Sequence, residues 1–130
     1  VDTLARLMVL VPDKAEYETG FQTWVERVGN LASQLACKVI FMAYPATSNF
    51  IRNVLEDEHF AIRHEYRELH NWDDFILHSA EIEDEDLLMV VGARKGSISH
   101  SGDLESLPAY LSRNFARNNL VVIYPEQFGG

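Results

Sequence analysis

The residues best suited to ligand chemistry lie in one loop that follows an apolar run. The stretch Asp86–Ser101 reads DLLMVVGARKGSISHS, and its apolar residues lead directly into a glycine. Glycine lets a backbone approach a ligand closely, and basic and hydroxyl side chains bind anions. The loop therefore predicts a nucleotide or small-anion site with the contacts Gly92, Arg94, Lys95, Gly96 and Ser97. The alternative interpretation is that the two glycines are only turn residues and Arg94 is a surface residue.

Strand and helix patterns alternate along the chain on both sides of this loop. Apolar runs predict buried strands over 4–11, 38–44, 87–91 and 120–124, and period-two alternation predicts another strand over 59–67. Apolar residues at helical spacing predict helices over 21–35, 46–57, 72–80 and 107–115. This order predicts one α/β domain over residues 1–130, a three-layer sandwich in which helices cover both faces of a parallel sheet.

In a parallel sheet, the loops at the carboxyl ends of the strands meet at one edge, which is where open α/β sheets bind ligands. The loops predicted to converge there are 12–17, 44–48, 67–72 and 92–103. Asp13 and Tyr44 thereby join the candidate site formed by the loop after Gly92.

Composition excludes several classes of function. The formal net charge of −9 argues against general nucleic-acid binding and against docking on an anionic membrane surface. The single cysteine, Cys37, has no internal disulfide partner, which indicates a reducing compartment, and its apolar neighbours predict a buried, inert thiol. No apolar run approaches the ~20 residues needed to span a bilayer.

No pattern in the chain predicts an enzyme. It has no Gly-x-Ser-x-Gly elbow, no Walker A loop and no metal-ligand spacing, so we expect neither a catalytic residue nor a metal site. The acidic run 81–86 is predicted to be a solvated loop rather than a metal cluster. Among the histidines, His64 and His100 are the candidates for a pH-sensing role.

The order of elements and the Asp86–Gly92 strand resemble those of the universal stress protein (UspA-like) family, whose fold is adenine nucleotide alpha hydrolase-like. Three segments are similar to the cytosolic C-terminal domain of bacterial monovalent-cation/proton antiporters: LVPDKAEY (10–17), GARKGSIS (92–99) and VIYPEQ (122–127). The resemblance implies a regulatory and dimerisation domain of a sodium (cation)/proton antiporter. The transmembrane domain would then belong to the same polypeptide, and this fragment would lie on the cytoplasmic side of the bacterial inner membrane. The alternative is a free-standing universal stress protein that binds AMP or ATP.

The resemblance also implies a nucleotide site. ATP-binding members carry an acidic residue after the first strand and a Gly-x-x-Gly, nine residues, Gly-Ser/Thr pattern after the fourth. Asp13 lies one residue later than that acidic residue and is expected to take its role of contacting ribose or adenine, and Gly92 matches the first glycine. The second glycine falls one position late, at Gly96, and the closing pair is Glu105-Ser106. Ser106 is retained, but a carboxylate beside it repels a triphosphate, so the resemblance implies AMP rather than Mg-ATP.

The last strand predicts self-association. The family's strand order, 3-2-1-4-5, leaves this strand at the edge of the sheet, and UspA-like proteins dimerise through it. Here the strand has no charge or proline to protect its edge before Pro125. The resemblance and the apolar edge together predict a homodimer through Leu120, Val121, Val122, Ile123 and Tyr124.

Overall fold

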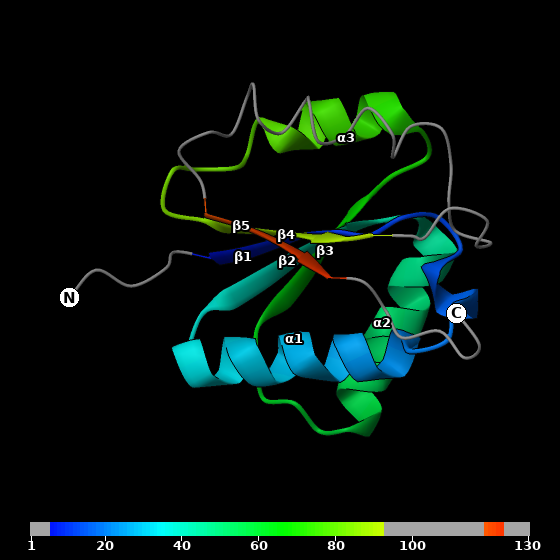
Figure 1. The fold of residues 1–130 in the computed structure, drawn as a ribbon, viewed down its shortest axis with the longest axis vertical. Helices are drawn as coiled ribbons and strands as arrows, with labels where there is room; N and C mark the ends of the chain where they lie inside the picture. Colours follow the sequence, from blue (N-terminus) through cyan, green and yellow to red (C-terminus); the bar gives the residue numbers. More distant parts are fainter. Residues whose placement is uncertain (1–5, 93–118, 124–130) are drawn as a thin grey trace.

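The computed structural model describes residues 6–92 and 119–123. Strands β1 (Arg6–Leu10), β2 (Lys38–Ala43), β3 (His64–Glu68) and β4 (Leu87–Val91) form a parallel sheet in the order β3-β2-β1-β4. Helices α1 (Phe21–Leu35) and α2 (Pro45–Asp57) cover one face of this sheet, and α3 (Trp72–Ser79) covers the other (Figure 1). The prediction of a parallel α/β sheet with helices on both faces is confirmed. The segment β5 (Asn119–Ile123) is paired in parallel with β4.

The central strands form because nearly every side chain in them is buried. In β1 and β2 only the first residue is partly exposed, as expected for strands covered on both faces. Alternate residues supply two separate cores. On the α1 and α2 face the core contains Val9, Phe41 and Met89, and on the α3 face it contains Met8, Ile40 and Leu88.

Helix α1 is the most regular amphipathic segment. Its buried residues recur every three or four positions and pack onto the sheet: Phe21, Trp24, Val25, Val28, Gly29 and Ala32. Gly20 precedes the helix with a φ of 90°, a conformation that glycine adopts without steric cost. The extent of this helix confirms the sequence prediction.

The other two helices begin differently from each other. Pro45 occupies the first position of α2, where its missing N–H costs no hydrogen bond, and Thr47 and Ser48 lie inside the first turn. Helix α3 begins as predicted, because the Asn71 side chain accepts a hydrogen bond of 3.0 Å from the Asp74 N–H.

The strand predicted over 59–67 is shorter than expected and begins only at His64. His59 adopts a left-handed φ of 58°, and the N–H of Phe60 donates to the Leu55 carbonyl at 3.0 Å. Residues 59 and 60 therefore still belong to the C-terminal cap of α2. Phe60 and Ile62 then pack against the core on the α1 and α2 face. Their period-two spacing therefore arises from this packing and not from strand pairing.

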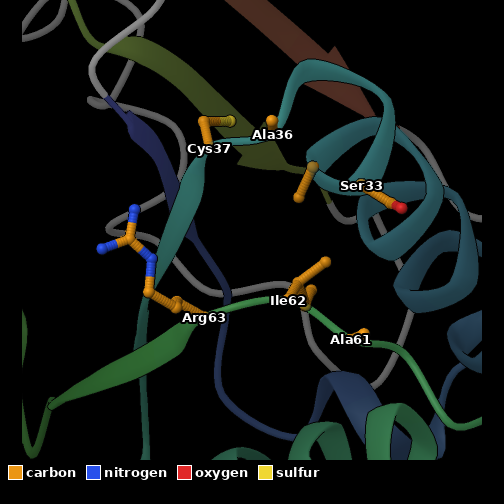
Figure 2. A pocket seen from close by; sticks show the side chains of 7 residues that line it. Ser33, Ala36, Cys37, Ala61, Ile62 and Arg63 are labelled. Carbon is orange, nitrogen blue, oxygen red and sulfur yellow. The ribbon is translucent and has the colours of Figure 1, made fainter.

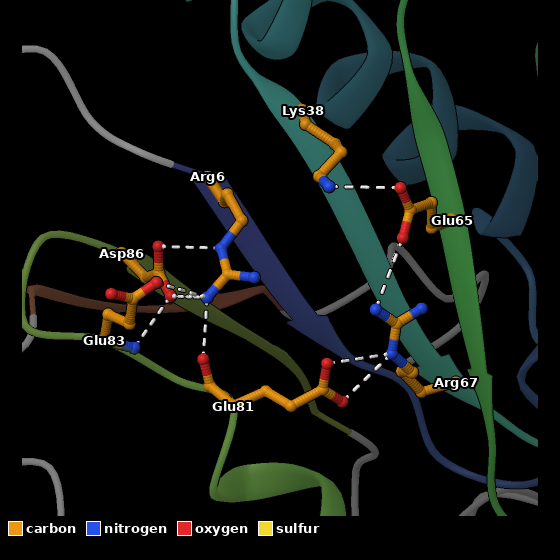
Figure 3. A network of polar contacts seen from close by, with 7 residues as sticks. All are labelled: Arg6, Lys38, Glu65, Arg67, Glu81, Glu83 and Asp86. Atoms are coloured by element: carbon orange, nitrogen blue, oxygen red, sulfur yellow. Dashed lines mark hydrogen bonds and ion pairs between the residues drawn. The ribbon is translucent and has the colours of Figure 1, made fainter.

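A network of ion pairs on the α3 face of the sheet joins the first residues of β1 and β2 to β3 and to the connection between α3 and β4 (Figure 3). Arg6 donates to both carboxylate oxygens of Asp86, at 3.2 and 2.8 Å, and to the Glu81 carbonyl at 2.6 Å. Arg67 donates to the Glu81 carboxylate at 2.9 and 3.1 Å, and Glu65 pairs with both Arg67 and Lys38. The prediction that residues 81–86 form a merely solvated loop is therefore wrong, because two of its carboxylates anchor the α3–β4 connection to the sheet.

Arg67 and Glu81 stabilise each other's charged forms. Hydrogen bonding to Arg67 lowers the pKa of Glu81, and hydrogen bonding to Lys38 lowers the pKa of Glu65. Both carboxylates thus remain ionised below the pH at which free glutamate would take up a proton.

Candidate functional site

The most suitable place for a ligand is the carboxyl edge of the sheet between β1 and β4. The chain leaves β1 toward β2 through α1 on one face, and it reaches β4 from β3 through α3 on the opposite face (Figure 1). The direction of the crossovers therefore reverses between β1 and β4. Such a reversal opens a crevice at the carboxyl ends of the strands, where α/β proteins bind ligands.

Strand register brings two of the predicted site residues to this point. Leu10 of β1 is paired with Val90 of β4. Pro12 and Gly92, each two residues further along the chain, therefore follow the ends of these two neighbouring strands. Asp13 follows Pro12 and is exposed, and Lys14 after it has a left-handed φ of 63° that starts a short 3-10 helix, η1 (Ala15–Tyr17). A carboxylate and a glycine that stands at the end of a buried strand thus meet at the reversal point.

The start of α2 forms the third side of this edge. Tyr44 is half-buried between β2 and α2, it packs against the core on the α3 face, and its carbonyl accepts the Ser48 N–H at 2.9 Å. The first N–H groups of a helix carry partial positive charge and attract anions. Tyr44 follows β2, the neighbour of β1, and so lies at the same edge of the sheet as Asp13.

A side-chain hydrogen bond that the sequence did not suggest joins η1 to α2. The Thr47 hydroxyl donates to the Glu16 carboxylate at 2.5 Å, although 31 residues separate them. Ser48 is 4% exposed, and its hydroxyl is one of two buried side-chain polar atoms without a hydrogen-bond partner in the described part of the chain. The contact between Thr47 and Glu16 holds the segment after Asp13 against the helix start.

The remaining predicted contacts, Arg94, Lys95, Gly96, Ser97 and Ser106, lie outside the described residues, as does His100. Of the predicted dimer edge, Leu120, Val121, Val122 and Ile123 form part of β5, and Tyr124 lies outside the described residues. The described part of the site thus consists of Asp13, Tyr44 and Gly92.

A pocket of about 270 Å³ lies at the opposite edge of the sheet, between the end of α1 and the segment before β3 (Figure 2). It is lined mostly by small side chains: Ala32, Ser33, Ala36, Cys37, Ala61, Ile62 and Arg63. Cys37 is buried, as predicted, and burial raises the pKa of its thiol, which disfavours the reactive thiolate. Among the described residues, Arg63 is the one charged residue that lines this pocket, and the pocket lies away from the predicted anion site.

Two weak signals in the sequence pointed to contacts that the structure reveals. Arg6 is the one charge inside an otherwise apolar run, and Asp86 directly precedes another apolar run. Charges at such positions are buried only when they are paired, but nothing in the sequence identifies the partner. The hydrogen bond between Thr47 and Glu16 carries no comparable signal, because both residue types are common at helix starts and in loops.

The described residues contain no group of three or more histidine, cysteine, aspartate or glutamate side chains able to hold a metal ion. Among the described helices, none has both the length and the apolar character needed to cross a membrane.

Comparison of the chain with protein-family models, with curated proteins and with solved structures found no match in any of the three.

Proposed function

We propose that this chain is a UspA-like domain with a five-stranded sheet in the order 3-2-1-4-5, and that it serves as the cytosolic regulatory and dimerisation domain of a monovalent cation/proton antiporter. Its ligand is a small anion of the nucleotide class, with AMP favoured over Mg-ATP. The proposal includes no catalytic activity.

One observation supports the ligand site most directly. The paired strands β1 and β4 end side by side where the crossovers reverse, and they present Asp13 and Gly92 from the two sides of that point. A carboxylate in this position accepts hydrogen bonds from ribose hydroxyls, and a glycine admits a phosphate to the backbone. Gly92 also matches the first loop glycine of nucleotide-binding UspA-like proteins, and Asp13 lies one residue after the position of their acidic residue.

The preference for a monophosphate follows from charge. Glu105 replaces the glycine that closes the triphosphate loop in ATP-binding relatives, and the chain as a whole carries a formal net charge of −9. Repulsion between one carboxylate and a further phosphate group costs about 1 kcal/mol, which corresponds to about fivefold in affinity. Arg94 and Lys95 supply enough positive charge to balance one phosphate.

Isothermal titration calorimetry tests the ligand with AMP, ADP and ATP, each with and without magnesium. We expect AMP to bind at least about fivefold more tightly than Mg-ATP. Gly92→Val is expected to abolish AMP binding, because its side chain fills the approach to the phosphate. Asp13→Asn is expected to weaken binding about tenfold, because it removes a charged hydrogen-bond acceptor.

Asp57→Asn is the matched control, since it makes the same chemical change at an exposed residue at the far end of α2. It should leave the affinity for AMP unchanged. Micromolar binding of Mg-ATP that is lost in Gly92→Val would contradict the preference for a monophosphate. Equal binding of AMP to the wild type and to both site variants would refute the site itself.

Self-association of the purified chain tests the proposed dimer. Light scattering is expected to give the mass of two chains at high protein concentration, because the apolar edge of β5 is free of charged residues and proline. A mass of one chain at the highest concentration would argue against a dimer. The antiporter assignment depends on the three similar segments, and it requires an upstream coding sequence with several apolar segments of ~20 residues.

A further inference from the structure

Edge strand β3 is attached to the rest of the protein through two aromatic side chains on the α2 face. His64 and Tyr66 are both half-buried, and the His64 Nδ1 lies 2.9 Å from the Tyr66 hydroxyl. The Tyr66 ring stacks on Phe41 of β2, with ring centroids 5.5 Å apart. The hydroxyl that contacts His64 is therefore held in place by a ring fixed in the core.

Helix α2 contributes two charges to the same cluster. The Arg52 guanidinium lies over the Tyr66 ring, 4.5 Å from its centroid, and Glu56 is one helical turn further along α2. Both charges act on His64, Arg52 by repelling its protonated form and Glu56 by attracting it. From β2, the residue paired with His64 is the apolar Val39. Lys38 and Glu65, which pair with each other, alternate onto the opposite face of the sheet.

The contact between His64 and Tyr66 depends on the charge of the imidazole. In the neutral tautomer with the proton on Nε2, Nδ1 accepts the hydroxyl proton of Tyr66. The imidazolium cannot accept this proton, because both of its nitrogens donate. The Tyr66 oxygen can accept from the protonated Nδ1–H instead, but the hydroxyl proton then loses His64 as its acceptor. Burial raises the pKa of Tyr66 above its usual range, so the hydroxyl keeps this proton.

We propose that His64 and Tyr66 form an acid-sensitive clasp that holds β3 against α2 and β2 when the imidazole is neutral and loosens when it is protonated. A proton on His64 places a second cation beside Arg52 and removes the acceptor of the Tyr66 hydroxyl. The clasp requires no ligand and no partner chain, so it is independent of the nucleotide proposal.

The direction of the pH dependence follows from the surroundings of His64. Burial lowers the pKa of His64 below its ordinary value of 6.5, Glu56 opposes this shift and Arg52 adds to it. The clasp is therefore fully formed above the ordinary pKa, where the imidazole is neutral in every state. It is weakened as the pH falls from there through the lowered pKa of the folded protein, because the opened state binds the proton more readily.

Nuclear magnetic resonance of the whole chain tests this proposal by following the histidine ring signals between pH 8 and pH 4.5. We expect His64 to titrate below the ordinary histidine pKa of 6.5, because burial and, to a smaller extent, Arg52 disfavour its charged form. Two substitutions in α2 should shift the midpoint of the His64 titration in opposite directions. Arg52→Gln should raise the midpoint because it removes a repelling cation, and Glu56→Gln should lower it because it removes an attracting anion.

Amide hydrogen exchange in the same samples measures the opening of β3. Protection factors, which correct for the intrinsic pH dependence of exchange, are expected to fall for the β3 amides as His64 takes up its proton. The fall is at most tenfold per pH unit, because a single proton is involved. In His64→Gln, which stays neutral, the β3 protection factors should not change over this range, while in the control His70→Gln they should fall as in the wild type.

Two results would overturn the clasp. One is a His64 midpoint at or above the ordinary histidine value of 6.5, or one that neither Arg52→Gln nor Glu56→Gln moves. The other is an undiminished loss of β3 protection in His64→Gln. Since the two α2 substitutions leave the clasp residues themselves unchanged, the first result decides the question even if His64→Gln fails to fold.

Discussion

Asp86→Asn is expected to lower the free energy of unfolding by about 3 kcal/mol. The Asp86 side chain is 0% exposed and that of Arg6 only 17%, and the two form a bidentate ion pair at 2.8 and 3.2 Å. Removing one partner of such a pair leaves an uncompensated charge away from water, which typically costs about 3–5 kcal/mol. The lower end applies here because Arg6 keeps the Glu81 carbonyl and the Glu83 carboxylate as partners.

Asp86 also organises the turn that precedes β4. Its carboxylate accepts the Glu83 N–H at 2.8 Å, so the same side chain closes the turn and receives the arginine from β1. Asparagine keeps one acceptor oxygen of similar shape, so the substitution tests the charge more than the packing. Urea unfolding monitored by circular dichroism measures the loss.

A double-mutant cycle separates the ion pair from other effects. Arg6→Met should destabilise the protein by at least as much as Asp86→Asn, because it leaves the fully buried carboxylate without its cation. The double variant should be more stable than the sum of the two losses predicts, since neither charge then remains unpaired. Asp57→Asn, at an exposed position, should change the free energy of unfolding by less than about 0.5 kcal/mol. Additive losses in the cycle would show that the two side chains do not act as a pair.

Gly29→Val is expected to lower the free energy of unfolding by about 1–3 kcal/mol, although glycine is itself a poor residue for the middle of a helix. A Cβ atom at position 29 would lie 3.0 Å from three ring carbons of Phe60, closer than carbon atoms normally approach. Valine adds two further methyl groups at this contact. The substitution therefore forces Phe60 away from the core against which it packs.

Two further variants test the contact with Phe60 as the cause. Asn30→Val places the same β-branched residue at the neighbouring exposed position of α1, so it measures the helix-propensity cost alone, which is about 0.5 kcal/mol or less. Phe60→Ala in the Gly29→Val background should cost less than Phe60→Ala in the wild type, because it relieves the clash. Thermal unfolding followed by circular dichroism provides these comparisons. Equal losses for Gly29→Val and Asn30→Val would contradict the role of Phe60.

The lengths and types of most elements could be predicted because they depend on local periodicity. The apolar runs of β2 and β4, the helical stripe of α1 and the Asn71 cap of α3 each depend on residues close together in the chain. The start of β3 could not be predicted in this way. Phe60 and Ile62 occupy alternate positions as in a strand, but both pack against the core on the α1 and α2 face, and Phe60 lies against Gly29 of α1.

The candidate site was predictable only in part, for a related reason. Asp13, Tyr44 and Gly92 each follow an apolar run, so a parallel sheet places them at one edge wherever the strands lie. Which of them are neighbours depends on strand order. The order 3-2-1-4 puts β1 between β2 and β4, and it thereby brings Asp13 beside both Tyr44 and Gly92.

The sequence by itself determined the alternation of strands and helices, the burial of the central strands and the loop with the chemistry of an anion site. Only the tertiary structure decided which charges meet. Arg6 and Asp86 are 80 residues apart, and Glu16 and Thr47 are 31 apart, and they are paired because parallel strands and their crossovers bring distant segments together. The clasp between His64 and Tyr66 acquires its charges from α2 in the same way. Hydrophobic periodicity acts over a few residues and is visible in the chain, whereas a polar contact depends on the packed arrangement of elements that the chain does not display.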